Sequence, residues 1–292
     1  MSKKKLNIIS TVVLVIMLLV GLSVMLYPVV SDWWNSKVQS RAVASYKETV
    51  ANMGENQTQE IFEKAHEYNR RLGELYKPLS DYEQVAGYEE TLDISGTGIM
   101  GYISIPAIGS ELVIYHSTDD EVLNIAAGHL QGTSLPVGGR GTHSVISAHR
   151  GLPSAKLFSD LDKLVVGDTF TITILDEVLT YEVEKIMIVE PDEAEKLLPV
   201  EGKDYVTLMT CTPYGVNTHR LLIRSKRIET AYTAKVNVTA EAVLVDSMLV
   251  VPLIAFPLFV GLIIYWTING KKRKSGSGGV IERYKKRKDG GA

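Results

Sequence analysis

The chain has 292 residues, of which 45% are hydrophobic, and its 31 Lys and Arg against 34 Asp and Glu give a net charge of -3. The basic residues gather near the two ends, in residues 3–5 and 271–288, so the long segment between them is acidic. An acidic middle argues against a nucleic-acid-binding protein, because neutralising phosphates requires a basic face on the folded domain itself.

Two uncharged apolar stretches lie just inside the basic ends. Residues 6–27 and 247–268 are each long enough to cross a hydrocarbon core of about 30 Å at 1.5 Å per residue. A cleaved signal peptide is the alternative for the first stretch, although such peptides have a shorter apolar part of about 7 to 15 residues. We therefore predict two transmembrane helices, at 6–30 and 247–268.

Positive charge beside each predicted span indicates its orientation. Residues 3–5 precede the first span and the basic residues 271–288 follow the second, and such residues stay on the cytoplasmic side. We expect a protein of the cell membrane with both termini cytoplasmic and residues 31–246 extracytoplasmic. Membrane lipid is then a partner, because basic clusters beside a span attract anionic headgroups.

The outer segment begins with a helical pattern. Apolar residues recur every three or four positions through residues 38–76, and Gly54 and Asn56 are expected to divide two helices. Residues 77–98 contain Pro78 and several glycines and show no period. Such a long loop in a compact domain is often functional.

From Met100 onward the pattern is that of strands, with β-branched and aromatic residues between Gly, Pro or Asp breaks. The predicted strands are 102–106, 111–116, 142–149, 168–175, 178–189, 205–211 and 219–225. Asp176 and Glu177 are expected to turn one hairpin. At least seven short strands, with only short helical pieces near 119–127 and 155–163, predict a closed or nearly closed barrel.

Cys211 is the only cysteine, so the domain has no internal disulfide. The thiol is then inert and buried, half of an intermolecular bridge, or reactive.

Cys211 ends one predicted strand and Arg220 opens the next, so a hairpin places the two residues across one loop mouth. Arg220 and Arg224 share one face of their strand. A guanidinium beside a thiol favours the thiolate and can bind an oxyanion. A buried Cys beside a surface Arg is the alternative of equal weight.

A cysteine nucleophile also needs a general acid and base, which is most often histidine. The chain offers His66, His116, His129, His143, His149 and His219. His66 lies in the helical region, on an expected solvated face. His149 ends a predicted strand, a position from which side chains often reach a site. Spacing alone does not exclude His129, His143 or His219.

The segment TLMTC, residues 207–211, with Arg220 nine positions later, resembles the signature of sortases, the membrane-anchored cysteine transpeptidases of Gram-positive surfaces. Residues 128–164 and 205–228 resemble the class C, pilus-assembling sortases in particular. The resemblance covers about residues 75–230. It implies a mainly β fold: an eight-stranded sortase-type β-barrel with N-terminal helices, flanked by the two transmembrane helices.

The predicted organisation has eight parts. These are a cytoplasmic basic N-terminus at 1–5, a transmembrane helix at 6–30, extracytoplasmic helices at 31–76, a possible lid loop at 77–98, the catalytic barrel at 99–232, a linker at 233–246, a transmembrane helix at 247–268 and a basic cytoplasmic tail at 269–292.

The resemblance places His149, Cys211 and Arg220 at the catalytic positions. It implies that Cys211 attacks the carbonyl between Thr and Gly of an LPXTG-like sorting signal and forms a thioester. His149 protonates the leaving amine and deprotonates the incoming one, while Arg220 holds the substrate backbone and stabilises the oxyanion. In class C the incoming amine is a Lys of another pilin, so the implied partners are pilins or other surface proteins that carry the sorting signal.

Three further residues accompany these segments. Thr207 and Thr210 are expected to line the substrate groove, with a purely structural role as the alternative for a β-branched residue in a strand. Arg224 is expected to be a solvated or salt-bridged neighbour, with replacement of Arg220 as the less favoured role.

Class C sortases generally carry a lid before the barrel, with an Asp, a Pro and an aromatic residue in the groove. Here residues 77–90 read KPLSDYEQVAGYEE, so Asp81 and Tyr82 supply the acid and the ring without the proline between them. Such a lid pairs Asp81 with Arg220 and lays Tyr82 over Cys211. An ordinary connecting loop is the alternative.

Two other functions stay open: a sortase that anchors proteins to a peptidoglycan precursor amine, and a membrane-anchored pilus scaffold that binds sorting signals without cleaving them. No metal is expected, because spacings such as C-x-x-C or H-E-x-x-H are absent. No cofactor is expected either, since Gly138, Gly139 and Gly141 lack the Lys and the following helix of a phosphate loop.

Overall fold

The computed structural model describes residues 3–230, with side chains from residue 10 onward. The predicted linker, second transmembrane helix and basic tail, at 233–246, 247–268 and 269–292, lie outside the described residues. The helices are α1 (Lys3–Ala51), α2 (Glu55–Gly73), α3 (Pro78–Asp81) and α4 (Asp120–Leu123), with short 3-10 helices η1 (Tyr82–Gln84), η2 (Pro106–Ile108), η3 (Leu161–Lys163) and η4 (Ala194–Leu197). The strands are β1 (Ile99–Ile105), β2 (Ser110–Tyr115), β3 (Ala127–His129), β4 (Thr142–Ser147), β5 (Thr169–Ile174), β6 (Glu177–Val189), β7 (Asp204–Thr212) and β8 (His219–Ile228).

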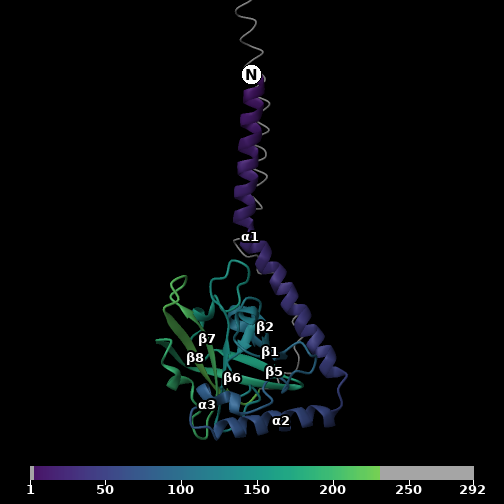
Figure 1. Cartoon of the computed structure of the whole chain (residues 1–292), viewed down its shortest axis with the longest axis vertical. Helices are drawn as coiled ribbons and strands as arrows, with labels where there is room; N and C mark the ends of the chain where they lie inside the picture. Colours follow the sequence, from purple (N-terminus) through teal and green to yellow (C-terminus); the bar gives the residue numbers. More distant parts are fainter. Residues whose placement is uncertain (1–2, 231–292) are drawn as a thin grey trace, which may run out of the picture. The chain divides into compact units, whose positions relative to one another are not determined.

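Helix α1 joins the predicted first span to the first extracytoplasmic helix without a break (Figure 1). In the part of the chain that the structure describes, it is the one helix long and apolar enough to cross a membrane, by length and composition. The helix continues past residue 30, where the predicted span ends. Pro28 lies inside the helix without ending it, because a membrane helix tolerates proline. Gly54 separates α1 from α2 as expected, whereas Asn56 lies inside α2.

The C-terminal half of α1 packs against the barrel through residues spaced three or four apart. Val43 and Tyr46 are buried there, and the Tyr46 hydroxyl donates to Met100 O at 2.9 Å and accepts from Leu175 N at 2.8 Å. About two turns before Tyr46, the Gln39 side chain accepts from Val113 N at 3.0 Å. These bonds fix α1 to β1 and β2 and to the end of β5.

The eight strands close into the predicted barrel, in the order β1-β2-β3-β4-β7-β8-β6-β5. The pairs β2/β3 and β4/β7 are parallel, and the other pairs are antiparallel. The β5–β6 hairpin pairs Ile174 with Glu177, so Leu175 and Asp176 form its turn, one residue earlier than predicted. Strand β3 was not predicted, because three residues are too few to show alternation.

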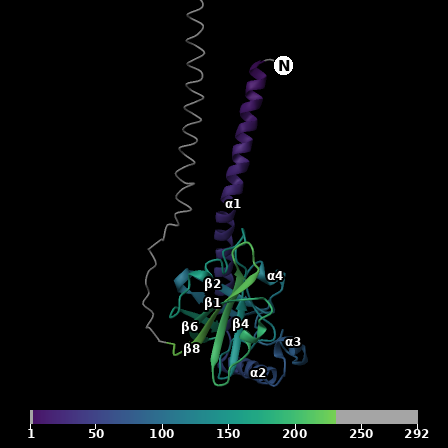
Figure 2. The ribbon, with the colours of Figure 1, turned by 90° about the vertical axis from the view of Figure 1, so that its left-hand side faces the viewer.

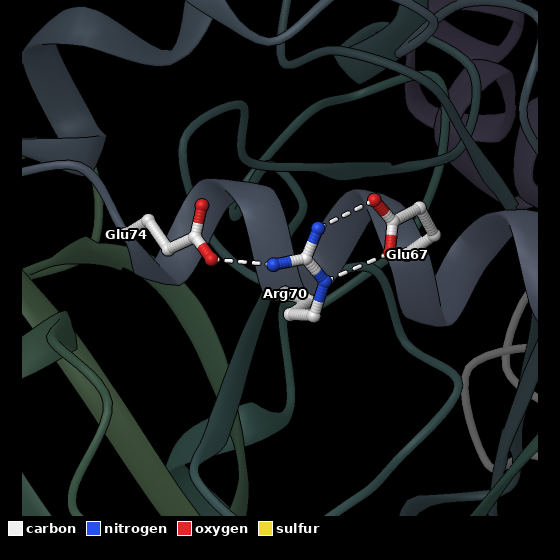
Figure 3. Close-up of polar contacts among 3 residues, drawn as sticks. All are labelled: Glu67, Arg70 and Glu74. Carbon is white, nitrogen blue, oxygen red and sulfur yellow. Dashed lines mark hydrogen bonds and ion pairs between the residues drawn. The ribbon is translucent and has the colours of Figure 1, made fainter.

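Helix α2 covers one end of the barrel (Figures 1 and 2). Its buried face carries Asn69, whose side chain donates to Leu135 O at 3.1 Å and accepts from Leu135 N at 2.7 Å. On the solvated face Arg70 bridges Glu67 and Glu74 (Figure 3). These exposed pairs support the helix and are screened by salt, so they do not mark a functional site.

Candidate functional site

Cys211 and Arg220 are direct cross-strand partners in the β7–β8 antiparallel pair. Side chains at such positions share one face of the sheet, with Cβ atoms about 4.5–5.5 Å apart. Alternation along β8 sends Leu221 and Ile223 into the main core, so Arg220 lies on the opposite face, as the sequence predicted. Cys211 is partly exposed. The structure therefore brings a solvent-accessible thiol and a guanidinium together at one end of the sheet.

The Arg220 guanidinium keeps unused donors. Its Nη1 donates to the carbonyls of Asn217 at 3.3 Å and His219 at 3.2 Å, which holds it against the β7–β8 connection. Within residues 10–230, the Nε and Nη2 groups of Arg220 make no hydrogen bond or ion pair. These N–H groups are available to an oxygen that develops negative charge near Cys211.

The parallel β4–β7 pair carries His149 toward Cys211. The pair aligns Ser147 with Met209, and two further bonds continue the alignment beyond it. Ala148 N donates to Met209 O at 3.2 Å, and Thr210 Oγ1 donates to Ala148 O at 2.8 Å. β4 ends at Ser147, and the same alignment continued two residues beyond it sets His149 level with Cys211. In the described residues its partly exposed imidazole has no hydrogen-bond partner.

The other five histidines lie in surroundings that differ from those of His149. Three are buried with both ring nitrogens bonded inside the protein, namely His116, His129 and His143. His66 lies on the exposed side of α2, as predicted, and His219 uses its two nitrogens on Thr218 and Glu190. Among residues 10–230 no three His, Cys, Asp or Glu side chains form a group suited to a metal ion.

Burial lowers the pKa of His129 to about 4 and also lowers the pKa of His143. In the unfolded chain the pKa of His129 is about 6.5. Between pH 4 and pH 6.5 the native state therefore binds fewer protons at His129 than the unfolded state does. The stability that neutral His129 contributes is therefore complete above pH 6.5 and is lost as the pH falls toward 4.

We accordingly expect the free energy of unfolding to fall between pH 7 and pH 4.5, with His129 accounting for about 2–3 kcal/mol of the decrease. His129→Gln should show a shallower pH dependence in urea titrations. The exposed His66→Gln variant is the control and should keep the slope of the wild type. An unchanged slope in His129→Gln contradicts this assignment.

The structure corrects the predicted groove roles of Thr207 and Thr210. Their exposed fractions are 0% and 2%, so neither lines a groove. Thr207 Oγ1 bonds His143 Nε2 at 2.7 Å, and Thr210 Oγ1 bonds the carbonyl before His149. Both hydroxyls satisfy buried polar groups, which is the structural alternative for a β-branched residue in a strand.

Arg224 is the salt-bridged neighbour that the sequence predicted. Its Nη2 lies 3.1 Å from Glu184 Oε2, and its guanidinium lies 4.8 Å from the centre of the Tyr205 ring. It pairs with Thr207 rather than with Cys211, four residues along β8 from Arg220. At about 3.4 Å per residue this is too far to replace Arg220.

An apolar hollow of about 250 Å³ adjoins Arg220. Met209 and Leu222, from β7 and β8, line it together with Leu197 of the connection between β6 and β7. No local sequence pattern marks this groove, because its walls come from segments far apart in the chain. The same connection is held by His143, whose Nδ1 bonds Leu198 O at 3.1 Å.

The predicted lid region lies at this groove, but through other residues than predicted. Leu79 of α3 lines the hollow, and its backbone passes so close to Gly132 that a Cβ there would lie 2.8 Å from the Leu79 Cα. Asp81 forms no ion pair with Arg220 in the described part of the chain. Tyr82 packs against the main core, near Tyr68. The predicted Asp81 and Tyr82 contacts are therefore wrong, because the α3 turn directs Leu79 to the groove instead.

Arg150 ties the segment after His149 to the end of β7, and no sequence signal marked it. Its side chain is 9% exposed and forms an ion pair with Asp162. Its Nη1 lies 3.5 Å from Thr212 Oγ1, and its guanidinium lies 5.8 Å from the centre of the Tyr214 ring. The residues that follow His149 and Cys211 are thus held together from outside the barrel.

Comparison with protein families identifies a sortase domain in residues 103–228, which begin in β1 and end with β8. Among curated proteins, Sortase A of Bacillus anthracis is 28% identical over 132 residues, which are 45% of this chain and 61% of that protein. Sortase D of Bacillus subtilis is 29% identical over 131 residues, 44% of this chain and 63% of that protein. The chain thus spans less than two thirds of these curated relatives.

Solved structures match over a longer region. Sortase C1 from Streptococcus agalactiae is 49% identical, with a TM-score of 0.60, and the match covers 65% of this chain and 99% of that one. Sortase C from Streptococcus pneumoniae, described in terms of its catalysis and pilin substrate specificity, is 44% identical with a TM-score of 0.59, covering 65% and 97% of the two chains.

Proposed function

The chain belongs to the sortase family of cysteine transpeptidases, in its class C, and from this premise we propose that it is a membrane-anchored enzyme that polymerises pilins. The observation that carries the proposal is the cross-strand pairing of Cys211 with Arg220 beside the unbonded imidazole of His149. Helix α1 supplies one membrane anchor, and the second span and the cytoplasmic termini belong to the same proposal.

The proposed reaction begins at the carbonyl between Thr and Gly of an LPXTG-like signal. The Cys211 sulfur attacks the carbonyl carbon, and the resulting tetrahedral intermediate expels the glycine amine, which takes a proton from His149. The truncated substrate is left as a thioester on Cys211. The acceptor amine then attacks the thioester carbonyl, gives its proton to His149, and the sulfur leaves as the thiolate.

Arg220 has two roles in this scheme. Its unpartnered N–H groups bind the carbonyl oxygen as it becomes an oxyanion, where a preorganised donor is most effective. It also borders the apolar hollow, so it orients the backbone of a bound peptide relative to Cys211. The hollow itself, lined by Met209 and Leu222, suits the apolar Leu and Pro that begin the sorting signal.

Leu79 acts as a lid residue in this proposal, because it lines one side of the hollow that the peptide needs. We expect Leu79→Ala to raise kcat/KM for a sorting peptide by roughly three- to tenfold, from the loss of about 1 kcal/mol of apolar contact. Asp81→Ala is the matched control, since Asp81 has no ion pair with Arg220. If Leu79→Ala is no faster than Asp81→Ala, the proposed lid role is wrong and residues 77–98 are an ordinary connecting loop.

The acceptor amine distinguishes pilin polymerisation from cell-wall anchoring. The class C neighbours, one of them described by its pilin specificity, favour a Lys side chain. The test incubates the enzyme and a sorting peptide with equal concentrations of a lysine-containing pilin segment and a peptidoglycan-type amine, and analyses the products by mass spectrometry. An isopeptide bond to lysine supports pilin polymerisation. If the product forms on the peptidoglycan-type amine alone, the proposed function becomes cell-wall anchoring.

A non-catalytic scaffold that only binds sorting signals is the remaining alternative. It predicts that Cys211→Ala binds a sorting peptide and supports pilus assembly as well as the wild type does. The proposed transpeptidase instead loses all assembly in that variant.

A further inference from the structure

Helix α1 exposes two tryptophans and two cations on one face, just where its uncharged stretch ends. That stretch runs from residue 6 to residue 31. Trp33 and Trp34 are 58% and 60% exposed, although each is a large aromatic ring. With Lys37, Val38 and Arg41 they line a shallow hollow of about 270 Å³, as their spacing of three and four residues requires. We call Trp33, Trp34, Lys37 and Arg41 the belt face.

The fold gives these side chains no partners. Lys37 and Arg41 make no hydrogen bond or ion pair within residues 10–230, and neither tryptophan joins a hydrophobic cluster there. Tryptophan is favoured at the level of lipid headgroups, where its ring is half in an apolar region, and Lys and Arg one turn farther out reach the phosphates. The belt face therefore has the composition and the position of a headgroup-binding surface.

The opposite face of the same helical turn holds the loop that follows His149. Ser31 Oγ donates to Ser154 O at 2.8 Å, and the Asn35 amide donates to the same carbonyl. Asp32 Oδ1 accepts from Lys156 N at 2.7 Å. This loop returns to the site through Phe158 N, which bonds the His149 carbonyl at 3.2 Å. One turn of α1 thus connects the membrane end of the chain to the backbone of the proposed acid and base.

We propose that the belt face docks on the anionic phospholipid headgroups of the bilayer that α1 enters, and so holds the His149 loop close to the membrane surface. This inference rests on the membrane anchoring in the proposed function. Two observations favour anionic phospholipid as the ligand. Lys37 and Arg41 are complementary in charge to anionic phosphates, and the belt face continues directly from the apolar stretch. A consequence is that sorting signals tethered in the same membrane react faster than signals free in water.

Lipid contact is tested by fluorescence on the full chain carrying Trp266→Phe, which leaves only Trp33 and Trp34 of the three tryptophans. The protein is reconstituted in vesicles of phosphatidylcholine with phosphatidylglycerol, with and without phosphatidylcholine brominated high on the acyl chain. We expect emission shifted to shorter wavelength and quenched by the brominated lipid. Protein that floats with the vesicles but emits as tryptophan in water, without quenching, overturns the docking and leaves the anchor intact.

The catalytic consequence is tested with two peptides that carry the same LPXTG sequence, one free and one joined to a membrane-spanning helix in the same vesicles. The measured quantity is the ratio of the two acylation rates. We expect Lys37→Glu with Arg41→Glu to lower this ratio by about tenfold, because each cation at an anionic surface contributes to binding. Lys185→Glu with Lys203→Glu, the same charge change at exposed positions on the barrel, should keep the ratio of the wild type.

A ratio that is unchanged in the Lys37 and Arg41 variant overturns the proposed link between docking and catalysis. If the wild type acylates neither peptide, the transpeptidase proposal fails, while the fluorescence measurement still decides whether the belt face binds lipid.

Discussion

Replacing Arg220 with Met is expected to lower the rate of acylation by a sorting peptide by about 10²–10³-fold, the usual loss when one oxyanion donor is removed. The reason is geometric: Arg220 is the cross-strand partner of Cys211 and keeps N–H groups without a partner in the described structure. Arg220→Lys should recover only part of the rate, since a single ammonium does not reproduce the planar guanidinium. Single-turnover kinetics with a labelled peptide measure the step directly.

Arg224→Met is the matched control for this experiment. Arg224 lies on the same strand, but it is paired with Glu184 and stacks on Tyr205. Its loss should leave the acylation rate within a few-fold of the wild type. If Arg224→Met is as slow as Arg220→Met, the assignment of the oxyanion donor to Arg220 is wrong.

His149→Gln should slow acylation by about 10²–10⁴-fold, the range for loss of a general acid and base. Gln keeps a hydrogen-bonding group of similar reach but transfers no proton. The structure supports this choice because His149 is the histidine that is partly exposed, has no ring hydrogen bond within residues 10–230 and continues the alignment toward Cys211. Added imidazole should restore part of the rate, since it supplies the missing proton carrier.

His219→Gln provides the comparison. His219 is aligned with Thr212 at the same mouth of the barrel, but its ring is bonded to Thr218 and Glu190. We expect its rate to stay within a few-fold of the wild type, without rescue by imidazole. A severe defect in His219→Gln beside an active His149→Gln would transfer the acid and base role to His219.

The sequence predicts the barrel and the placement of Cys211 and Arg220 across one loop mouth, because both depend on local patterns. Alternating residues indicate the strands, and a hairpin places Cys211 and Arg220 on opposite sides of its loop. Their direct pairing follows only from the register in the structure. The same patterns cannot show β3, which has three residues. They also cannot select His149, because the parallel β4–β7 alignment joins residues about sixty positions apart.

The groove and the lid contact could not be predicted, because they depend on tertiary contacts that no local sequence pattern shows. Thr207 lies on the strand of Cys211, but the β6–β7 connection and His143 bury it, which spacing along one strand does not show. The lid was predicted at Asp81 and Tyr82 from the resemblance of residues 77–90 to the lid of class C sortases. Its contact with the groove is made by Leu79, because Pro78 begins the α3 turn over Gly132.

The most direct measurement is intact-protein mass spectrometry of the full chain in detergent after incubation with an LPXTG-type peptide, with Cys211→Ala alongside. The wild type should gain the mass of the peptide's acyl fragment ending at Thr, and hydroxylamine should release it. Cys211→Ala should gain nothing. An adduct of equal size on both proteins, or no adduct on the wild type even when Leu79→Ala opens the groove, would contradict a thioester mechanism at Cys211.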